Sequence, residues 1–304
     1  MSDVIAERRN ADPRAGPGAA RSDIAISQKQ LFWRQFRRHR LALLSAAVLL
    51  ALAALVILAP WIAPYSFDAI DPTQFRKPPS PAHIMGTDDI GRDLFTRLLY
   101  GGRISLAIGI FSAMVGTSVG TLMGSLAGYY GRALDNLIMR VTDVAFSIPS
   151  LPLLIILSAY AKSAIPVMIL VIGLLSWMST ARIVRATVLS IRERDFTLAA
   201  RSVGSRDARI LVRHILPNAL APIIVGATLG VGGAIIAESS LSFLGLGVQV
   251  PTPSWGNMLQ DSQSTMASRP WLTIFPGMAI LITVLGINFL GDGLRDALDP
   301  TIRS

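Results

Sequence analysis

The residue spacing that comes closest to a catalytic motif in this chain is the G-x-S-x-G pattern at residues 116–120. In hydrolases this pattern presents a nucleophilic serine on a sharp turn between a strand and a helix, within reach of an activating histidine. Here Ser118 lies within a long run without charged residues, which predicts the middle of a membrane helix. The histidines, His39, His83 and His214, lie in or near polar segments and are not spaced as a metal-binding pair. We therefore predict that the chain is not an enzyme.

Cofactor and nucleotide sites are not supported by the residue pattern either. A Walker A loop needs a glycine before its lysine, whereas Lys29, Lys77 and Lys162 follow glutamine, arginine and alanine. The absence of cysteine excludes thiolate metal sites and disulfides. We predict no cofactor, no metal site and no ATP site in this chain.

The elements that hold these residues follow from the distribution of charge. Only 15% of the 304 residues are charged and 52% are hydrophobic, with a mean hydropathy of +0.52, whereas a typical soluble domain is about 25% charged. Long runs without charge lie between residues 40 and 68, 103 and 132, 143 and 162, 162 and 182, 213 and 238, and 269 and 292. Each is long enough to cross a hydrocarbon core of about 30 Å as a helix. We predict an all-α integral membrane protein with six transmembrane helices.

A seventh uncharged run, at residues 239–260, is interrupted by Gln249, Pro251 and Pro253. Irregular backbone is not tolerated where it faces lipid, so this run is expected to be an extramembrane or re-entrant loop. Trp255 and Trp271 are expected to anchor the protein at the outer membrane boundary.

Charged groups inside spans are the usual relays of ion-coupled carriers, and the predicted span interiors contain none. Glu238, at the predicted outer end of the fifth span, comes nearest to such a group. It has two interpretations: a gate or substrate contact on a translocation path, or, more simply, an interfacial carboxylate at a helix end. The chain therefore carries no recognisable energy source of its own.

Basic residues predict the orientation of the spans. Nine of them precede residue 41 and eight lie between residues 182 and 213, whereas the alternate loops contain five, one and one. By the positive-inside rule, both termini and the 182–213 loop face the cytoplasm. The net charge of +9 thus mainly records orientation, with 21 basic residues inside and 7 outside, and no nucleic-acid partner is predicted.

These assignments divide the chain into four segments. Residues 1–40 form a basic cytoplasmic tail, in which 28–40 is either an interfacial helix on anionic membrane lipid or a basic flank that only sets orientation. Residues 41–101 hold the first span and an extracytoplasmic loop. Residues 102–292 form the main transmembrane domain, with a cytoplasmic loop at 185–217, and 293–304 form a cytoplasmic tail.

A run of small residues recurs at every fourth position of the second span. Its members are Ser112, Gly116, Gly120, Gly124 and Gly128. This spacing puts all five on one narrow helix face, where a neighbouring helix can approach backbone to backbone. Helix packing is the simpler interpretation, and a groove that admits substrate is the alternative.

The large basic loop contains a candidate docking element. A short helix is expected over about 195–203, with Ala199 and Ala200 small enough for close approach and Gly204 in a left-handed conformation at its end. Pro217 suits the first turn of the next span. The element is either a docking site for a cytoplasmic partner or an ordinary linker between helices.

This loop resembles the cytoplasmic signature of the permease subunits of binding-protein-dependent ABC importers, which reads E-A-A, three residues, G, and later I-x-L-P. The matching residues are Ala199, Ala200, Gly204, Leu216 and Pro217. Leu198 replaces the usual glutamate, and His214 stands at the isoleucine position, as is usual in the peptide branch with its H-I-L-P-N ending. Residues 83–93, 238–247 and 291–300 are similar to further blocks of the oligopeptide and dipeptide C-type subunit, in the same order.

The resemblance implies the type I ABC importer permease fold in the bacterial inner membrane and ATP-driven import of di- or oligopeptides. It implies partners: a B-type permease subunit, one or two cytoplasmic ATPase subunits that bind the ATP, and an extracytoplasmic substrate-binding protein. It also makes the loop helix the ATPase-coupling element. The residues expected to contribute are Asp195, Ala199, Ala200, Gly204, His214, Leu216 and Pro217. A nickel or glutathione permease, and a self-contained carrier or channel, are the alternatives.

The block at residues 83–93 has two interpretations. It contacts substrate directly, or Gly86 and Gly91 are turn glycines beside a solvated cluster of charges on the outer face. The charged residues of this cluster are Asp88, Asp89, Arg92, Asp93 and Arg97.

Overall fold

The computed structural model describes residues 28–160 and 164–298. Within these ranges the chain is helical and has no strand beyond a single bridge between Thr87 and Asp93. The helices long and apolar enough to cross a membrane are α2 (Arg40–Ile57), α4 (Leu94–Tyr130), α7 (Ile165–Arg192), α10 (Leu216–Phe243) and α12 (Trp271–Leu298). A short helix, α9 (Asp207–Ile210), and a π turn (Leu211–Ile215) extend α10 at its start. The predicted all-α membrane fold is confirmed.

The third predicted span, between residues 143 and 162, is not a single straight helix. It holds only the last turn of α5 (Arg132–Ser147) together with α6 (Ser150–Tyr160), and these two helices meet at an angle of 85°. The break falls at Pro149, and the residue before it, Ile148, is extended, with φ −88° and ψ 122°. Proline disfavours helical conformation in the residue that precedes it, so α5 ends there. The described residues thus contain five unbroken spans and one bent pair.

The remaining helices are short and lie at the two ends of the bundle. They are α1 (Gln28–Arg38), α3 (Ala59–Ile62), α8 (Asp195–Ser202) and α11 (Trp255–Ser262), with 3-10 turns at Pro72–Gln74 and Gln263–Thr265. Of the predicted N-terminal tail, residues 1–27 lie outside the described residues. Two predicted boundaries differ from the structure: α4 already begins at Leu94, and α12 continues to Leu298.

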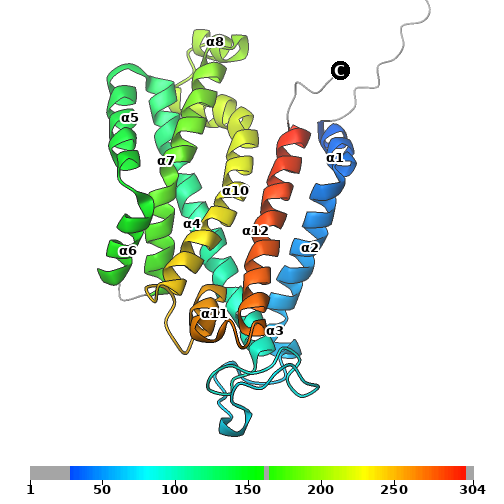
Figure 1. The fold of residues 1–304 in the computed structure, drawn as a ribbon. Coiled ribbons are helices and arrows are strands. Elements are labelled where there is room, and N and C mark those ends of the chain that lie inside the picture. Colours follow the sequence, from blue (N-terminus) through cyan, green and yellow to red (C-terminus); the bar gives the residue numbers. More distant parts are fainter. Residues whose placement is uncertain (1–27, 161–163, 299–304) are drawn as a thin grey trace, which may run out of the picture.

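The arrangement of the helices is plain in Figure 1. The long helix α4 packs along α7 and also contacts α10, while α12 packs between α10 and α2. Helices α1 and α8 lie at the end of the molecule where α12 ends, and α11 and the 65–93 loop lie at the other end. Phe36 of α1 is buried against Ala42 and Ala297, which fixes α1 beside α12.

The small-residue face of α4 is covered by α7. A Cβ atom built on Gly120 would lie 2.6 Å from the Trp177 carbonyl oxygen, and one on Gly124 would lie 2.4 Å from the Ala181 carbonyl oxygen. Gly116 and Gly128 meet α7 in the same way, and Ser112 is buried. Such contacts are possible only without a side chain, so these residues set how closely α4 and α7 approach. In the structure this face packs helix against helix.

Candidate functional site

Helix α8 is a short, exposed element built on the ends of two spans. Asp195 lies in its first turn, where a negative charge interacts favourably with the helix dipole. Gly204 ends it with φ +80°, and the Ser205 amide donates to the Ala200 carbonyl oxygen at 3.2 Å, which is the Schellman arrangement. The Thr197 hydroxyl is buried and donates to the Ile191 carbonyl oxygen of α7 at 3.0 Å. The helix is therefore seated on α7 by one side and free on the other.

The predicted coupling residues divide between these two sides. Asp195, Ala199, Gly204 and Pro217 are exposed. Ala200 and Leu216 are partly buried against an apolar cluster formed by α4, α7 and the start of α10, and His214 is half-buried in the π turn.

Three apolar side chains that sequence reasoning did not single out add to the outer surface of the loop. Phe196 and Leu198 are 40% and 41% exposed, and Val203 is 86% exposed. Exposed apolar side chains often mark a site of protein contact when they cluster on a surface. The loop thus exposes three apolar side chains between charged residues.

A cavity of about 410 Å³ lies within the bundle, between α4, α6, α7 and α10. Its lining is uncharged and mixes small apolar residues with hydroxyl groups. The hydroxyl-bearing residues are Thr117, Ser150, Ser176, Ser179 and Thr180. On α10 the lining includes Gly226 and Gly233, and no described atom outside the helix's own backbone lies within 4 Å of a Cβ atom built on either.

Glu238 lies near the end of α10 and does not line this cavity. Its side chain is 0% exposed. The Ser242 hydroxyl donates to one carboxylate oxygen at 2.7 Å and the Ser105 hydroxyl of α4 donates to the other at 3.1 Å. The Trp255 amide, at the start of α11, donates to Ser105 Oγ at 3.1 Å. Glu238 therefore joins α4, α10 and α11 near the end of α10, and the helices enclose its side chain.

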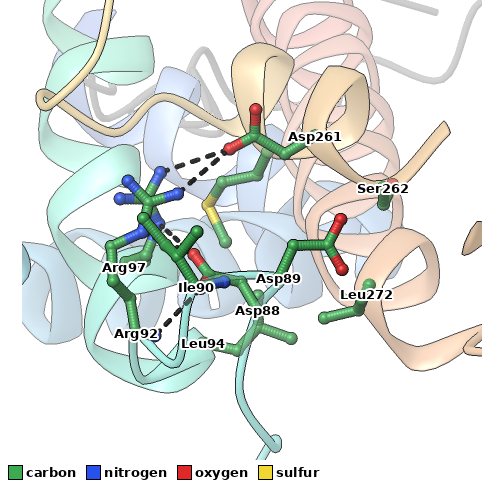
Figure 2. A pocket seen from close by; sticks show the side chains of 10 residues that line it. Asp88, Asp89, Ile90, Arg92, Leu94, Arg97, Asp261, Ser262 and Leu272 are labelled. Atoms are coloured by element: carbon green, nitrogen blue, oxygen red, sulfur yellow. Dashed lines mark hydrogen bonds and ion pairs between the residues drawn. The ribbon is translucent and has the colours of Figure 1, made fainter. Parts of the chain in front are cut away.

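The charged residues of the 83–93 block form a buried network. Arg92 Nε donates to Asp88 Oδ2 at 2.6 Å, and Arg97, only 1% exposed, lies 3.6 Å from the same carboxylate (Figure 2). Asp93 caps α4 by accepting the Thr96 amide at 2.8 Å. The interpretation as a solvated cluster is wrong for these residues, because the loop folds over the start of α4 and buries their side chains.

Asp89, Gly86 and Gly91 of the same block are not part of the buried ion-pair network. Asp89 remains partly exposed and pairs with Arg76 at 2.8 Å. Gly86 and Gly91 have φ values of +83° and +86°, and a Cβ atom on Gly91 would lie 2.0 Å from the Asp71 carbonyl oxygen, so the turn-glycine interpretation is confirmed.

Of the two tryptophans expected at the outer boundary, Trp255 is buried and Trp271 is half-buried. Trp255 is 1% exposed and its indole NH donates to the Leu98 carbonyl oxygen at 3.1 Å, so the expected role as an interfacial anchor is wrong for this residue. Trp255 is the first residue of α11 and so part of the cap itself, while Trp271 packs against Leu94 and Met258.

Asp261 of α11 completes the network and was missed by sequence reasoning. Its carboxylate lies 3.4 Å from Arg92 and 3.6 Å from Arg97, and the three side chains border a cavity of about 170 Å³ (Figure 2). Burial raises the pKa of Asp261, and the two guanidinium groups oppose this shift. In the sequence, Asp261 is the one charged residue between residues 239 and 268, and this isolation could have indicated a specific role for it.

A helical bundle with an uncharged, half-open cavity between its helices, a polar cap at one end and an exposed short helix at the other is typical of a membrane transport component. Residues 120–304 match the family described as the binding-protein-dependent transport system inner membrane component, and residues 27–79 match the N-terminal transmembrane domain of oligopeptide transport permease C. The chain belongs to this family of ABC importer permeases, multi-pass proteins of the bacterial inner membrane. The resemblance seen in the sequence is confirmed.

Relatives with assigned transport roles match nearly the whole chain. The dipeptide transport system permease protein DppC of Alkalihalophilus pseudofirmus is 42% identical over 280 residues, which cover 92% of each chain. The glutathione transport system permease protein GsiD of Escherichia coli O157:H7 is 45% identical over 273 residues, which cover 90% of each chain. The GsiD protein of Pectobacterium atrosepticum is 43% identical over 274 residues.

Among solved structures, the chain is similar to the inward-facing methionine ABC transporter MetNI. The TM-score is 0.51 with 19% sequence identity, and the match covers 66% of this chain and 96% of that one. This likeness supports the type I ABC importer permease fold. Family membership further implies that ATPase and binding-protein partners act with this chain.

Proposed function

We propose that this chain is the C-type half of a heterodimeric translocation path for di- or oligopeptides, paired with a B-type permease. The observation that carries the proposal is the similarity to dipeptide and glutathione permeases over at least 90% of the chain. Dipeptides and glutathione share a peptide backbone with free carboxylate and amino groups. The uncharged, hydroxyl-rich cavity suits such substrates, because it solvates them without favouring one net charge.

The cavity is less suited to nickel. No histidine or carboxylate is present among its described lining residues, and across the described part of the chain no three metal-ligating residues come together. Nickel in proteins prefers imidazole and other strong donors. A peptide of a few residues is therefore the proposed class of substrate, and glutathione is the alternative.

The proposed mechanism is alternating access driven by partner subunits. ATP binding closes two cytoplasmic ATPase subunits, whose grooves hold α8 of this chain and its counterpart. The free side of α8, with its exposed apolar side chains, supports this docking role. Movement of α8 rocks the spans so that the cavity opens outward to the binding protein, and ATP hydrolysis restores the inward-facing state. The proposed orientation puts α1, α8 and the end of α12 in the cytoplasm, which agrees with their common position at one end of the bundle.

Reconstitution tests the proposal as a whole. The complete assembly in proteoliposomes is expected to take up a labelled dipeptide when both ATP and the binding protein are present, and glutathione uptake is measured in parallel. This chain reconstituted alone is expected to give no flux. Flux through the chain alone would refute the proposal in favour of a self-contained carrier or channel, and uptake of nickel without peptide uptake would refute the substrate class.

A bulky residue on α8 tests the coupling role. Ala199 is exposed, so Ala199→Trp is expected to fold normally but to block docking, and we expect transport and ATPase co-purification to fall at least tenfold. Ala133→Trp is the matched control, because Ala133 is an exposed alanine on α5 outside the loop. Unchanged transport in Ala199→Trp would show that α8 is not the coupling element.

A further inference from the structure

Helix α4 reaches from the α8 loop past the cavity to the cap formed by α11 and the 65–93 loop. It runs without a break from Leu94 to Tyr130, about 55 Å at 1.5 Å per residue. Its last turn lies beside the α8 loop, Thr117 lines the cavity, and Ser105 and Arg97 belong to the two networks at the outer end. One continuous helix thus joins the turn beside the α8 loop to the cavity.

The last turn of α4 is held to the loop by one side chain, Tyr129. The side chain is 4% exposed and belongs to the apolar cluster on which Ala200 packs. Its hydroxyl donates to Asp207 Oδ1 at 2.7 Å, at the start of α9 and 78 residues away in the chain. The guanidinium carbon of Arg201, in the last turn of α8, lies 5.8 Å from the centre of the Tyr129 ring, within reach of a cation–π contact.

A second contact fixes the backbone at the same point. Arg192, the last residue of α7, donates to the carbonyl oxygens of Gly128 and Tyr129 at 3.3 and 3.1 Å. A cation that binds the last carbonyl groups of a helix stabilises that helix end. The end of α4 is thus tied to α7 through its backbone, and to α8 and α9 through the Tyr129 side chain.

We propose that Tyr129 is the positioning residue that transmits movement of α8 to α4, through the bond from its hydroxyl to Asp207 and the contact of its ring with Arg201. The inference rests on the proposed coupling role of α8 and deepens it. The neighbouring Tyr130 provides the contrast, because its side chain is 48% exposed and contacts the Tyr129 ring by its edge.

The test measures transport and ATP hydrolysis by the complete assembly in lipid nanodiscs and proteoliposomes. Tyr129→Phe keeps the buried ring and removes only the hydroxyl, so assembly and basal ATPase activity are expected to stay at wild-type levels. The number of substrate molecules moved per ATP is expected to fall about tenfold, as for the loss of one hydrogen bond to a charged group. Tyr130→Phe is the matched control and is expected to leave this ratio unchanged.

Asp207 variants separate transmission from a general loss of stability. Asp207→Asn keeps an acceptor oxygen for the Tyr129 hydroxyl and is expected to retain most coupling, whereas Asp207→Ala is expected to match Tyr129→Phe. The double variant Tyr129→Phe/Asp207→Ala is expected to be no worse than either single variant, because both remove the same bond. Additive losses, or a wild-type ratio of transport to hydrolysis in Tyr129→Phe, would overturn the inference.

The outcomes also separate this inference from the proposed function. If Ala199→Trp leaves transport intact, the coupling role of α8 fails and the inference fails with it. If Ala199→Trp abolishes transport while Tyr129→Phe transports with the wild-type ratio, α8 is the coupling element and only transmission through Tyr129 is refuted.

Discussion

Gly124 is the position on α4 where a single added methyl group has the most direct steric effect on the bundle. A Cβ atom there would lie 2.4 Å from the carbonyl oxygen of Ala181, 2.9 Å from Val184 Cβ and 3.0 Å from the Arg185 amide nitrogen. Two of these three atoms belong to the backbone of α7 and cannot rotate away. We therefore expect Gly124→Ala to push the two helices apart by about 1 Å, the difference between 2.4 Å and an ordinary contact of 3.4 Å.

The energetic cost follows from the packing. Overfilling a well-packed contact costs about 1–3 kcal/mol, while alanine in a helix is favoured over glycine by about 0.5–1 kcal/mol. Gly233→Ala on α10 is the matched control, because no atom outside the helix's own backbone is described within 4 Å of that Cβ position. The gain in helix propensity is common to both variants. The difference between their free energies of unfolding therefore isolates the packing term, about 1–3 kcal/mol.

Thermal unfolding of the purified chain in detergent, followed by circular dichroism, measures this difference. Gly124→Ala is expected to unfold below the wild type, and Gly233→Ala at or above it, with midpoints separated by on the order of 5 °C. If Gly124→Ala proves as stable as Gly233→Ala, the close approach of α4 and α7 is not set by this glycine, and the packing argument is wrong.

Two further predictions concern the end of the bundle at which α11 lies. Glu238→Leu leaves the hydroxyl groups of Ser105 and Ser242 without their acceptor and is expected to lower the free energy of unfolding by about 2–4 kcal/mol. Glu238→Gln keeps one acceptor oxygen and is expected to lose less stability. Equal losses for the two variants in denaturant titrations would contradict the hydrogen-bond network around Glu238. Because burial raises the pKa of Asp261, the folded protein holds this proton more tightly than the unfolded chain, so the stability contributed is greatest below about pH 4 and declines as pH rises above it. Asp261→Asn is expected to remove this slope from the unfolding midpoints measured between pH 4 and 7, and parallel profiles would refute the assignment.

Local sequence determines the membrane-spanning helices, the small-residue packing face and the end of α8. The uncharged runs predict spans because lipid offers no partner to backbone polar groups, so a long apolar run must form a helix. The four-residue spacing from Ser112 to Gly128 and the glycine at 204 act within one or two helical turns, and both have the predicted local geometry in the structure. The bend in the third span also has a local cause, Pro149, which a prediction from the distribution of charge does not take into account.

The environments of the charged residues were decided by tertiary structure. Glu238 was expected at a helix end, as a gate or an interfacial carboxylate, and is enclosed with Ser105, which lies 133 residues away. Arg97 was expected to be solvated and is buried beside Asp261, and Trp255 was expected to be a membrane anchor and is buried at the start of α11. Helix periodicity and charge runs extend over a few turns and contain no information on which distant segment covers a given face. Whether a carboxylate meets water, a serine or a guanidinium depends on that covering segment, and only the folded chain brings it into place.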